Sequence, residues 1–197
     1  MTAINLHISK SQAVICVDSL ASLPRSKEPA KFVSKAFPLM HIHTVVLGAG
    51  TFQFILDWVR FIQEQSYATN VLDLNKITPK YLNKLVGKYS TQGFEQNTIY
   101  HIGYMEKDES IHAFSYRSDN LFTSKKYEYV STVTKPPIKI PEVKTLPDDL
   151  YNTMVQQKIE DDKALVGEKV GIGGKCFAIL VDKHGIFISA GKTLDTG

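Results

Sequence analysis

The strand-like segments of this sequence come in neighbouring pairs joined by short polar connections. Residues 4–8 alternate between apolar and polar side chains, and an apolar run over residues 13–17 follows after four polar residues. An alternation with period two indicates a strand with one buried face. Strands joined by so short a connection pair in the antiparallel sense. The chain is therefore expected to begin with a β-hairpin.

Further strands are expected in the middle and at the end of the chain. The middle hairpin carries the polar connection Glu106-Lys107-Asp108-Glu109-Ser110, and the final one turns at Lys183-His184-Gly185. The expected strands cover residues 42–47, 98–105, 111–116, 121–130, 176–181 and 186–190.

The helices are expected in separate blocks between these strands. Thr51 opens an amphipathic helix, and Thr78 is an N-cap candidate for a second helix with Pro79 in its first position. The second helix is expected to end at Gly93, and a third to cover residues 148–165. The apolar stripe of the first helix consists of Phe54, Ile55, Trp58, Phe61 and Ile62.

This order of elements predicts the fold class. Strands grouped in hairpins, with helices in blocks, favour antiparallel sheets layered with helices over alternating βαβ units. The proline-rich stretch 131–147 is interpreted as an extended surface connection and not as a domain linker. We therefore expect an α+β fold in a single domain over residues 1–197.

Composition excludes several classes of function. The net charge is only +3, and no basic stripe is interleaved with aromatic residues, so a nucleic-acid surface is not expected. No signal segment or membrane-length apolar run is present, which favours a cytoplasmic protein without a membrane partner. Cys16 and Cys176 lie in separate apolar runs and are interpreted as buried thiols in a reducing compartment, although a disulfide remains an alternative.

Metal and phosphate motifs are incomplete. The His41-x-His43 pair would share one face of a strand, but the sequence offers no third and fourth ligand beside it. The glycine-rich segment 171–176 lacks the first glycine of a phosphate-binding loop, because position 169 is Lys169, and Cys176 stands where Ser or Thr is required. We therefore expect no metal and no cofactor.

The remaining candidates for chemistry are Thr2, Asp18 and Lys35. Removal of Met1 would leave Thr2 with a hydroxyl nucleophile and its own α-amine as a base. Each residue also has an ordinary interpretation, as a chain end, a residue in a turn after a strand and a surface charge.

In their order and spacing these residues resemble the proteasome β-subunit family of N-terminal-nucleophile hydrolases, including the bacterial proteasome-like peptidases. The similarity lies in Thr2, the segment Val17-Asp18-Ser19-Leu20-Ala21, Lys35 displaced by about one residue, and the turn Leu47-Gly48-Ala49-Gly50 before the helix of Trp58. Later motifs, in the 99–116 hairpin and after Gly173-Gly174, are short and degenerate. The resemblance spans most of the chain.

The resemblance implies a four-layer αββα sandwich, the N-terminal-nucleophile hydrolase fold, and a threonine protease. Catalysis would use Thr2, Asp18, Lys35 and Gly50. The Lys35 ammonium would favour the alkoxide of Thr2, Asp18 would hold that lysine in place, and Gly50 would donate its N–H to the oxyanion. It further implies a peptide or unfolded protein as substrate, a homo-oligomeric ring and an ATP-dependent unfoldase as a partner.

The sequence also departs from the family pattern. Aligned on Gly173-Gly174, the positions of a supporting Asp and Ser hold Lys169 and Ile172, and Glu168 is a candidate substitute. The Gly-Ser-Gly segment expected after the third extended piece is replaced by the proline-rich stretch. Two alternatives therefore stand beside the peptidase: a catalytically inactive scaffold or binding subunit, and a small-molecule amidase on the same fold.

Overall fold

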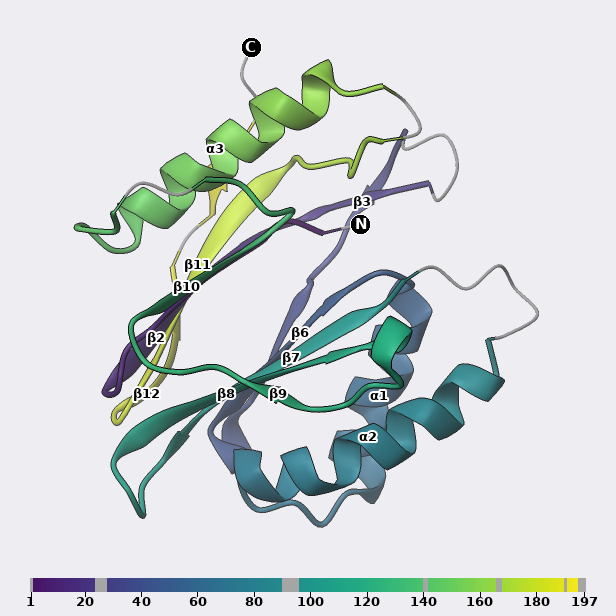
Figure 1. Cartoon of the computed structure of the whole chain (residues 1–197), viewed down its shortest axis with the longest axis vertical. Helices are drawn as coiled ribbons and strands as arrows, with labels where there is room; N and C mark the ends of the chain where they lie inside the picture. Colours follow the sequence, from purple (N-terminus) through teal and green to yellow (C-terminus); the bar gives the residue numbers. More distant parts are fainter. Residues whose placement is uncertain are drawn as a thin grey trace.

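The computed structural model describes residues 2–23, 28–89, 96–139, 142–165, 168–189 and 191–194 of the 197-residue chain. Its layers are helix, sheet, sheet and helix (Figure 1). This is the αββα sandwich that the resemblance implied. Helix α3 (Asp148–Lys163) covers one outer face, and α1 (Phe52–Gln65) and α2 (Val71–Gly87) cover the other (Figure 1).

Both sheets are antiparallel. The first runs in the order β10-β1-β2-β11-β12, with β13 paired to β11, and the second in the order β5-β6-β7-β8-β9. The strands of the first sheet are β1 (Ile4–Ile8), β2 (Gln12–Asp18), β10 (Ser131–Lys135), β11 (Lys175–Asp182), β12 (Gly185–Ile188) and β13 (Lys192–Thr193). Those of the second are β5 (Ala36–Leu39), β6 (Thr44–Ala49), β7 (Thr98–Met105), β8 (Ser110–Arg117) and β9 (Lys125–Lys126). A separate pair joins β3 (Leu20–Ser22) to β4 (Pro29–Phe32).

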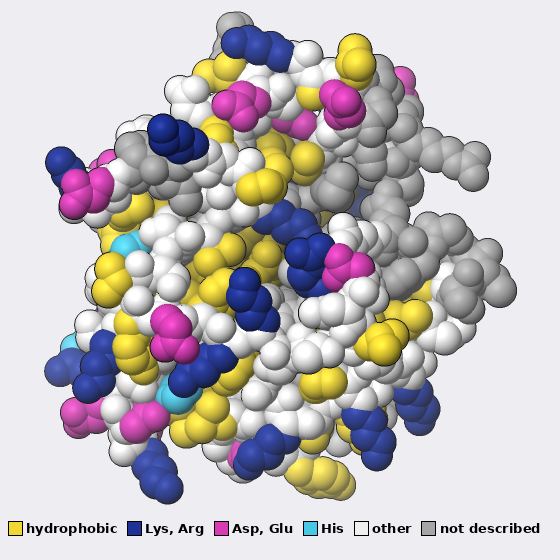
Figure 2. All heavy atoms as spheres, viewed as in Figure 1, with side chains coloured by type: hydrophobic (Ala, Val, Ile, Leu, Met, Phe, Trp, Pro, Cys, Tyr) yellow, Lys and Arg dark blue, Asp and Glu magenta, His cyan; other side chains and the backbone are white. Residues whose placement is uncertain are grey.

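The period-two alternation of β1 puts Ile4, Leu6 and Ile8 on the face between the two sheets, where they are buried. A second apolar cluster lies between β6–β8 and the helices α1 and α2, with Phe54 and Trp58 of α1 at its centre. Hydrophobic and Lys/Arg side chains lie together in the hollow between the layers (Figure 2). The interior is therefore built as the sequence pattern predicts.

The expected start of the second helix was wrong. α2 begins at Val71, and Asn70 is its N-cap, with its side chain accepting from the N–H groups of Leu72 and Asp73. Thr78 lies inside the helix and donates its hydroxyl to the Leu74 carbonyl, and Pro79 follows as an interior residue. The expected end at Gly93 lies outside the described residues.

The proline-rich region and the strands on either side of it also differ from expectation. Residues 131–135 form β10, which pairs with β1, so the start of this stretch is a sheet strand and not a surface connection. The extended segment expected over residues 121–130 contains only the two residues of β9, because Leu121, Phe122 and Val130 have positive φ angles. The strand expected from residue 42 begins at Thr44; His41 lies in a 3₁₀ turn (Met40–Ile42) and His43 in the left-handed region, so the pair shares no strand face.

The remaining outcomes concern the cysteines and membrane insertion. Cys16 and Cys176 are free and buried, as expected. Across the described residues, no helix combines the length and hydropathy that a membrane span requires.

His101 of β7 is fully buried and accepts a hydrogen bond of 3.1 Å from Trp58 Nε1. Burial lowers the pKa of His101 to about 3, so the native imidazole stays neutral while the unfolded one takes a proton below a pH of about 6.5. The unfolded state therefore binds more protons, and stability falls as the pH falls. We expect a loss of about 2–3 kcal/mol between a pH of about 6.5 and about 4.5.

Chemical denaturation at several pH values measures this loss. His101→Gln keeps an acceptor for Trp58 Nε1 but cannot take up a proton in this range, so its stability should depend less on pH. An equal pH dependence in the two proteins would contradict this role of His101.

Candidate functional site

The predicted site residues Thr2, Asp18 and Lys35 come from three segments that meet at one end of the sandwich. Asp18 is the last residue of β2, and its N–H donates to the Ala3 carbonyl at 3.3 Å, which extends the β1–β2 ladder past Ile4. Thr2 lies one residue further and is 4% exposed. The hairpin thus brings Asp18 beside the start of the chain.

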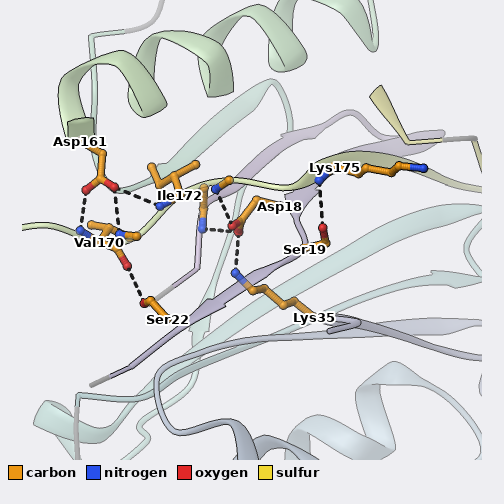
Figure 3. A network of polar contacts seen from close by, with 11 residues as sticks. Asp18, Ser19, Ser22, Lys35, Asp161, Val170, Ile172 and Lys175 are labelled. Carbon is orange, nitrogen blue, oxygen red and sulfur yellow. Dashed lines mark hydrogen bonds and ion pairs between the residues drawn. The ribbon is translucent and has the colours of Figure 1, made fainter. Parts of the chain in front are cut away.

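Lys35 reaches Asp18 from the segment between β4 and β5. Its Nζ lies 2.8 Å from Asp18 Oδ1, and the two side chains are almost completely buried (Figure 3). The carbonyl of Lys35 accepts from the Gly48 N–H at 3.4 Å, which ties the segment to the end of β6. The Asp18–Lys35 ion pair therefore links the two sheets.

Both oxygens of the Asp18 carboxylate accept hydrogen bonds from other described residues. Oδ1 receives the Ala3 N–H at 2.8 Å as well as Lys35, and Oδ2 receives the Gly173 N–H at 3.3 Å. Burial raises the pKa of Asp18, and Lys35 and the two backbone N–H groups oppose the rise. Burial likewise lowers the pKa of Lys35, opposed by Asp18, so Lys35 releases its proton more readily than a surface lysine.

Gly50 sits in the turn that connects β6 to α1. Its φ of +124° is a backbone conformation that residues with a side chain rarely adopt. A Cβ added to Gly50 would lie 2.4 Å from Asn97 Oδ1. The buried Asn97 accepts the Thr51 N–H at 2.7 Å and so fixes the turn. No signal in the sequence pointed to Asn97.

The structure brings Asp18 and Lys35 into contact and leaves Thr2 and Gly50 without a direct bond to them. Among the described residues no hydrogen bond joins Thr2 to either member of the ion pair. The roles of Thr2, Asp18, Lys35 and Gly50 in catalysis therefore remain predictions.

A cavity of about 630 Å³ opens beside the ion pair. Asp18 and Lys35 line it together with apolar side chains that include Phe177, Ile179 and Ile188. The exposed residue Phe32 and Lys175 also line this cavity. An apolar group bound there would contact Lys35.

A second lysine approaches the space between the sheets. Lys135, the last residue of β10, stands opposite Ile4 of β1 and donates to Thr98 Oγ1 at 2.6 Å. Burial, with a smaller contribution from Arg117, lowers the pKa of Lys135 to about 8. Nothing in the sequence pattern pointed to this lysine, because residues 131–135 were not expected to form a strand.

The suggested substitute Glu168 is exposed, and the loop before Gly173 is bound instead by Asp161 of α3. Asp161 accepts the N–H groups of Val170, Gly171 and Ile172 (Figure 3). At the positions of the family's Asp and Ser, Ile172 donates its backbone N–H to Asp161, and Lys169 donates its backbone N–H to the Leu165 carbonyl.

Comparison with known proteins supports the fold. No family model matches the chain, and no curated protein matches it. Among solved structures, Anbu (ancestral beta-subunit) from Yersinia bercovieri matches with a TM-score of 0.66 over 95% of this chain and 86% of that one, at 10% sequence identity. The chain therefore has the proteasome-like N-terminal-nucleophile hydrolase fold.

Proposed function

We propose that this chain is an N-terminal threonine hydrolase of amide bonds, a proteasome-like peptidase in which Thr2 is the nucleophile after removal of Met1. The observation that carries the proposal is the buried Lys35–Asp18 ion pair. Asp18 Oδ1 accepts both from Lys35 Nζ and from Ala3 N, the residue that follows Thr2. A buried lysine is thereby held next to the start of β1.

The surroundings of Lys35 suit the activation of a hydroxyl. Burial lowers its pKa, which makes the neutral amine more accessible as a base, and its protonated form stabilises a nearby alkoxide. Asp18, held by two backbone N–H groups, keeps the side chain oriented. A surface lysine would serve neither purpose as well.

In the proposed reaction Thr2 Oγ1 attacks the carbonyl carbon of the substrate, and its proton passes to the free α-amine or to Lys35. The N–H of Gly50 stabilises the oxyanion of the tetrahedral intermediate. The C–N bond then breaks, the leaving amine takes up the proton, and an ester to Thr2 forms. Water hydrolyses this ester, releasing the acid and restoring the hydroxyl.

The substrate that we propose is a peptide or an unfolded protein with an apolar side chain beside the cleaved bond. Support comes from the cavity next to Lys35, whose lining includes the apolar side chains of Val17, Ala36, Phe177, Ile179 and Ile188.

Because the name of Anbu describes a subunit, we extend the proposal to a homo-oligomeric ring that receives substrate from an ATP-dependent unfoldase. Light scattering tests the ring: a multimer is expected, and a monomer would favour the small-molecule amidase.

A peptide epoxyketone tests the nucleophile, because closure of its ring adduct needs the hydroxyl and the α-amine of one N-terminal residue. We expect one adduct per chain, located by peptide mapping on the fragment that begins with Thr2. Thr2→Ala should abolish the adduct. Thr123→Ala, at an exposed threonine, should leave it unchanged.

Two results would reject the proposal. A folded wild-type chain that begins at Thr2 yet takes no adduct would favour the inactive scaffold subunit. An adduct that persists in Thr2→Ala would show that another group reacts.

A further inference from the structure

We infer that Asp161 is a positioning residue, which holds the backbone of residues 170–173 so that the Gly173 N–H is directed at Asp18. Its effect on catalysis rests on the proposed function, but its effect on Asp18 does not. Asp161 lies in the last turn of α3, far from Asp18 in sequence, and the loop connects the two (Figure 3).

The position of Asp161 in α3 indicates that its negative charge does not stabilise the helix. A carboxylate in the last turn faces the negative end of the helix dipole, which disfavours it. Asp161 is also only 8% exposed, so water does little to compensate. Its stabilisation must therefore come from the loop.

The loop supplies three consecutive donors. Val170 N donates to Oδ1, and Gly171 N and Ile172 N donate to Oδ2 at 2.9 and 3.0 Å. Successive backbone N–H groups that converge on one anion form a nest, and the positive φ of Gly171 (+78°) lets the chain curve around the carboxylate. Asp161 thus fixes the path of the backbone up to Ile172.

Gly173, the next residue, connects the loop held by Asp161 to the Asp18–Lys35 ion pair. Gly173 N donates to Asp18 Oδ2 at 3.3 Å, and Gly173 O accepts from Leu20 N at 3.2 Å. Lys175 N donates to Ser19 Oγ at 2.9 Å, which closes the loop onto the end of β2. A shift of the loop would remove the donor from Oδ2 while leaving Ala3 and Lys35 on Oδ1.

The test compares Asp161→Asn with Asp162→Asn. The asparagine at 161 keeps the side-chain volume but loses the charge and one acceptor oxygen. Asp162 is the matched control, because it is exposed and its carboxylate forms hydrogen bonds only with Lys158 among the described residues, at 2.8 and 3.0 Å. Carboxyl ¹³C NMR titration of Asp18 is the readout, since it needs no catalytic activity.

We expect the pKa of Asp18 to rise by about one unit in Asp161→Asn, because a buried carboxylate loses a donor to its charged form. Amide exchange at Gly173 should become about tenfold faster. Asp162→Asn should change neither quantity. Asp161→Glu, which keeps the charge, should shift Asp18 less than Asp161→Asn does.

An unchanged Asp18 titration in a folded Asp161→Asn chain would overturn the inference. If neither variant at 161 folds, exchange in the wild type decides: protected amides at Val170, Gly171 and Gly173 support the inference, and unprotected amides reject it. The two proposals fail separately. A shifted Asp18 without epoxyketone labelling would reject only the hydrolase, whereas normal labelling with an unmoved Asp18 would reject only the role of Asp161.

Discussion

Replacing Lys35 with methionine is expected to lower the free energy of unfolding at neutral pH by about 3–5 kcal/mol. The substitution keeps an unbranched side chain of similar size and removes the charge that faces Asp18. The Asp18 carboxylate is 1% exposed, so without Lys35 it must either stay charged in an apolar interior or take up a proton. Both outcomes cost stability, and chemical denaturation measures the loss.

Two comparisons make this prediction specific to the buried pair. Lys88→Met breaks the ion pair of Lys88 with Asp57, but Lys88 is largely exposed, so a loss of at most about 1 kcal/mol is expected. Adding Asp18→Asn to Lys35→Met removes the unpaired charge and should recover a large part of the stability. A Lys35→Met chain no less stable than Lys88→Met would contradict the account.

The same variant should lose its reaction with the epoxyketone. Methionine can neither accept a proton from Thr2 nor stabilise an alkoxide, and such groups typically contribute about 10²–10⁴-fold in rate. The double variant Lys35→Met/Asp18→Asn should be stable and yet remain unlabelled, which separates chemistry from folding. Labelling of that double variant at the wild-type rate would exclude Lys35 from the reaction.

Substitution of Gly50 has the second large expected effect. In Gly50→Ala the new Cβ would lie 2.4 Å from Asn97 Oδ1 and 2.8 Å from the Gln96 carbonyl, at a φ of +124°. Strain of this kind and the displacement of Asn97 should cost about 2–4 kcal/mol. The turn that presents the Gly50 N–H should also move, so labelling of Thr2 should fall by about two orders of magnitude.

Gly87→Ala is the matched control for this substitution. Gly87 ends α2, and nothing lies within 4 Å of a Cβ added there. Alanine favours the helix over glycine by about 1 kcal/mol, so stability should stay the same or increase. Equal losses in the two variants would mean that the turn at Gly50 carries no special constraint.

The hairpins and the first helix were predictable because their signals are local, whereas the four-layer arrangement was implied by the resemblance to a known family. The hairpins of β1–β2 and β7–β8 follow from alternation and short connections, and the single apolar stripe of α1 identifies it without reference to the rest of the fold. β10 was missed because its identity as a strand comes from its pairing with β1, more than 120 residues away. The prolines that follow β10 led to its interpretation as part of a surface connection.

The start of α2 shows a second kind of failure. Thr78-Pro79 has the form of a helix start, but the hydroxyl of Thr78 bonds to the carbonyl of Leu74 within the helix. Asn70, eight residues earlier, supplies a cap with two hydrogen bonds, and Val71 and Leu74 are buried in the apolar cluster between the helices and the second sheet. Packing and a stronger cap outweigh the cost of an internal proline.

Parts of the candidate site were likewise visible in the sequence. Asp18 and Lys35 were identified through the resemblance to the proteasome β-subunit family, and the structure places Lys35 Nζ 2.8 Å from Asp18 Oδ1. Asp161 could not be found in this way. Its partners are backbone N–H groups, which every residue except proline offers, and an aspartate near a helix end is ordinary. Only the path of the loop identifies it.

Whether the peptide bond between Met1 and Thr2 is cleaved is the most direct test of the proposed function. Intact-mass spectrometry of the purified protein should give the mass of a chain that begins at Thr2, because only then does the nucleophile carry the free α-amine that the reaction needs. A chain that retains Met1 quantitatively would contradict the account, and the buried Lys35–Asp18 pair would then be part of a proteasome-like subunit without threonine catalysis.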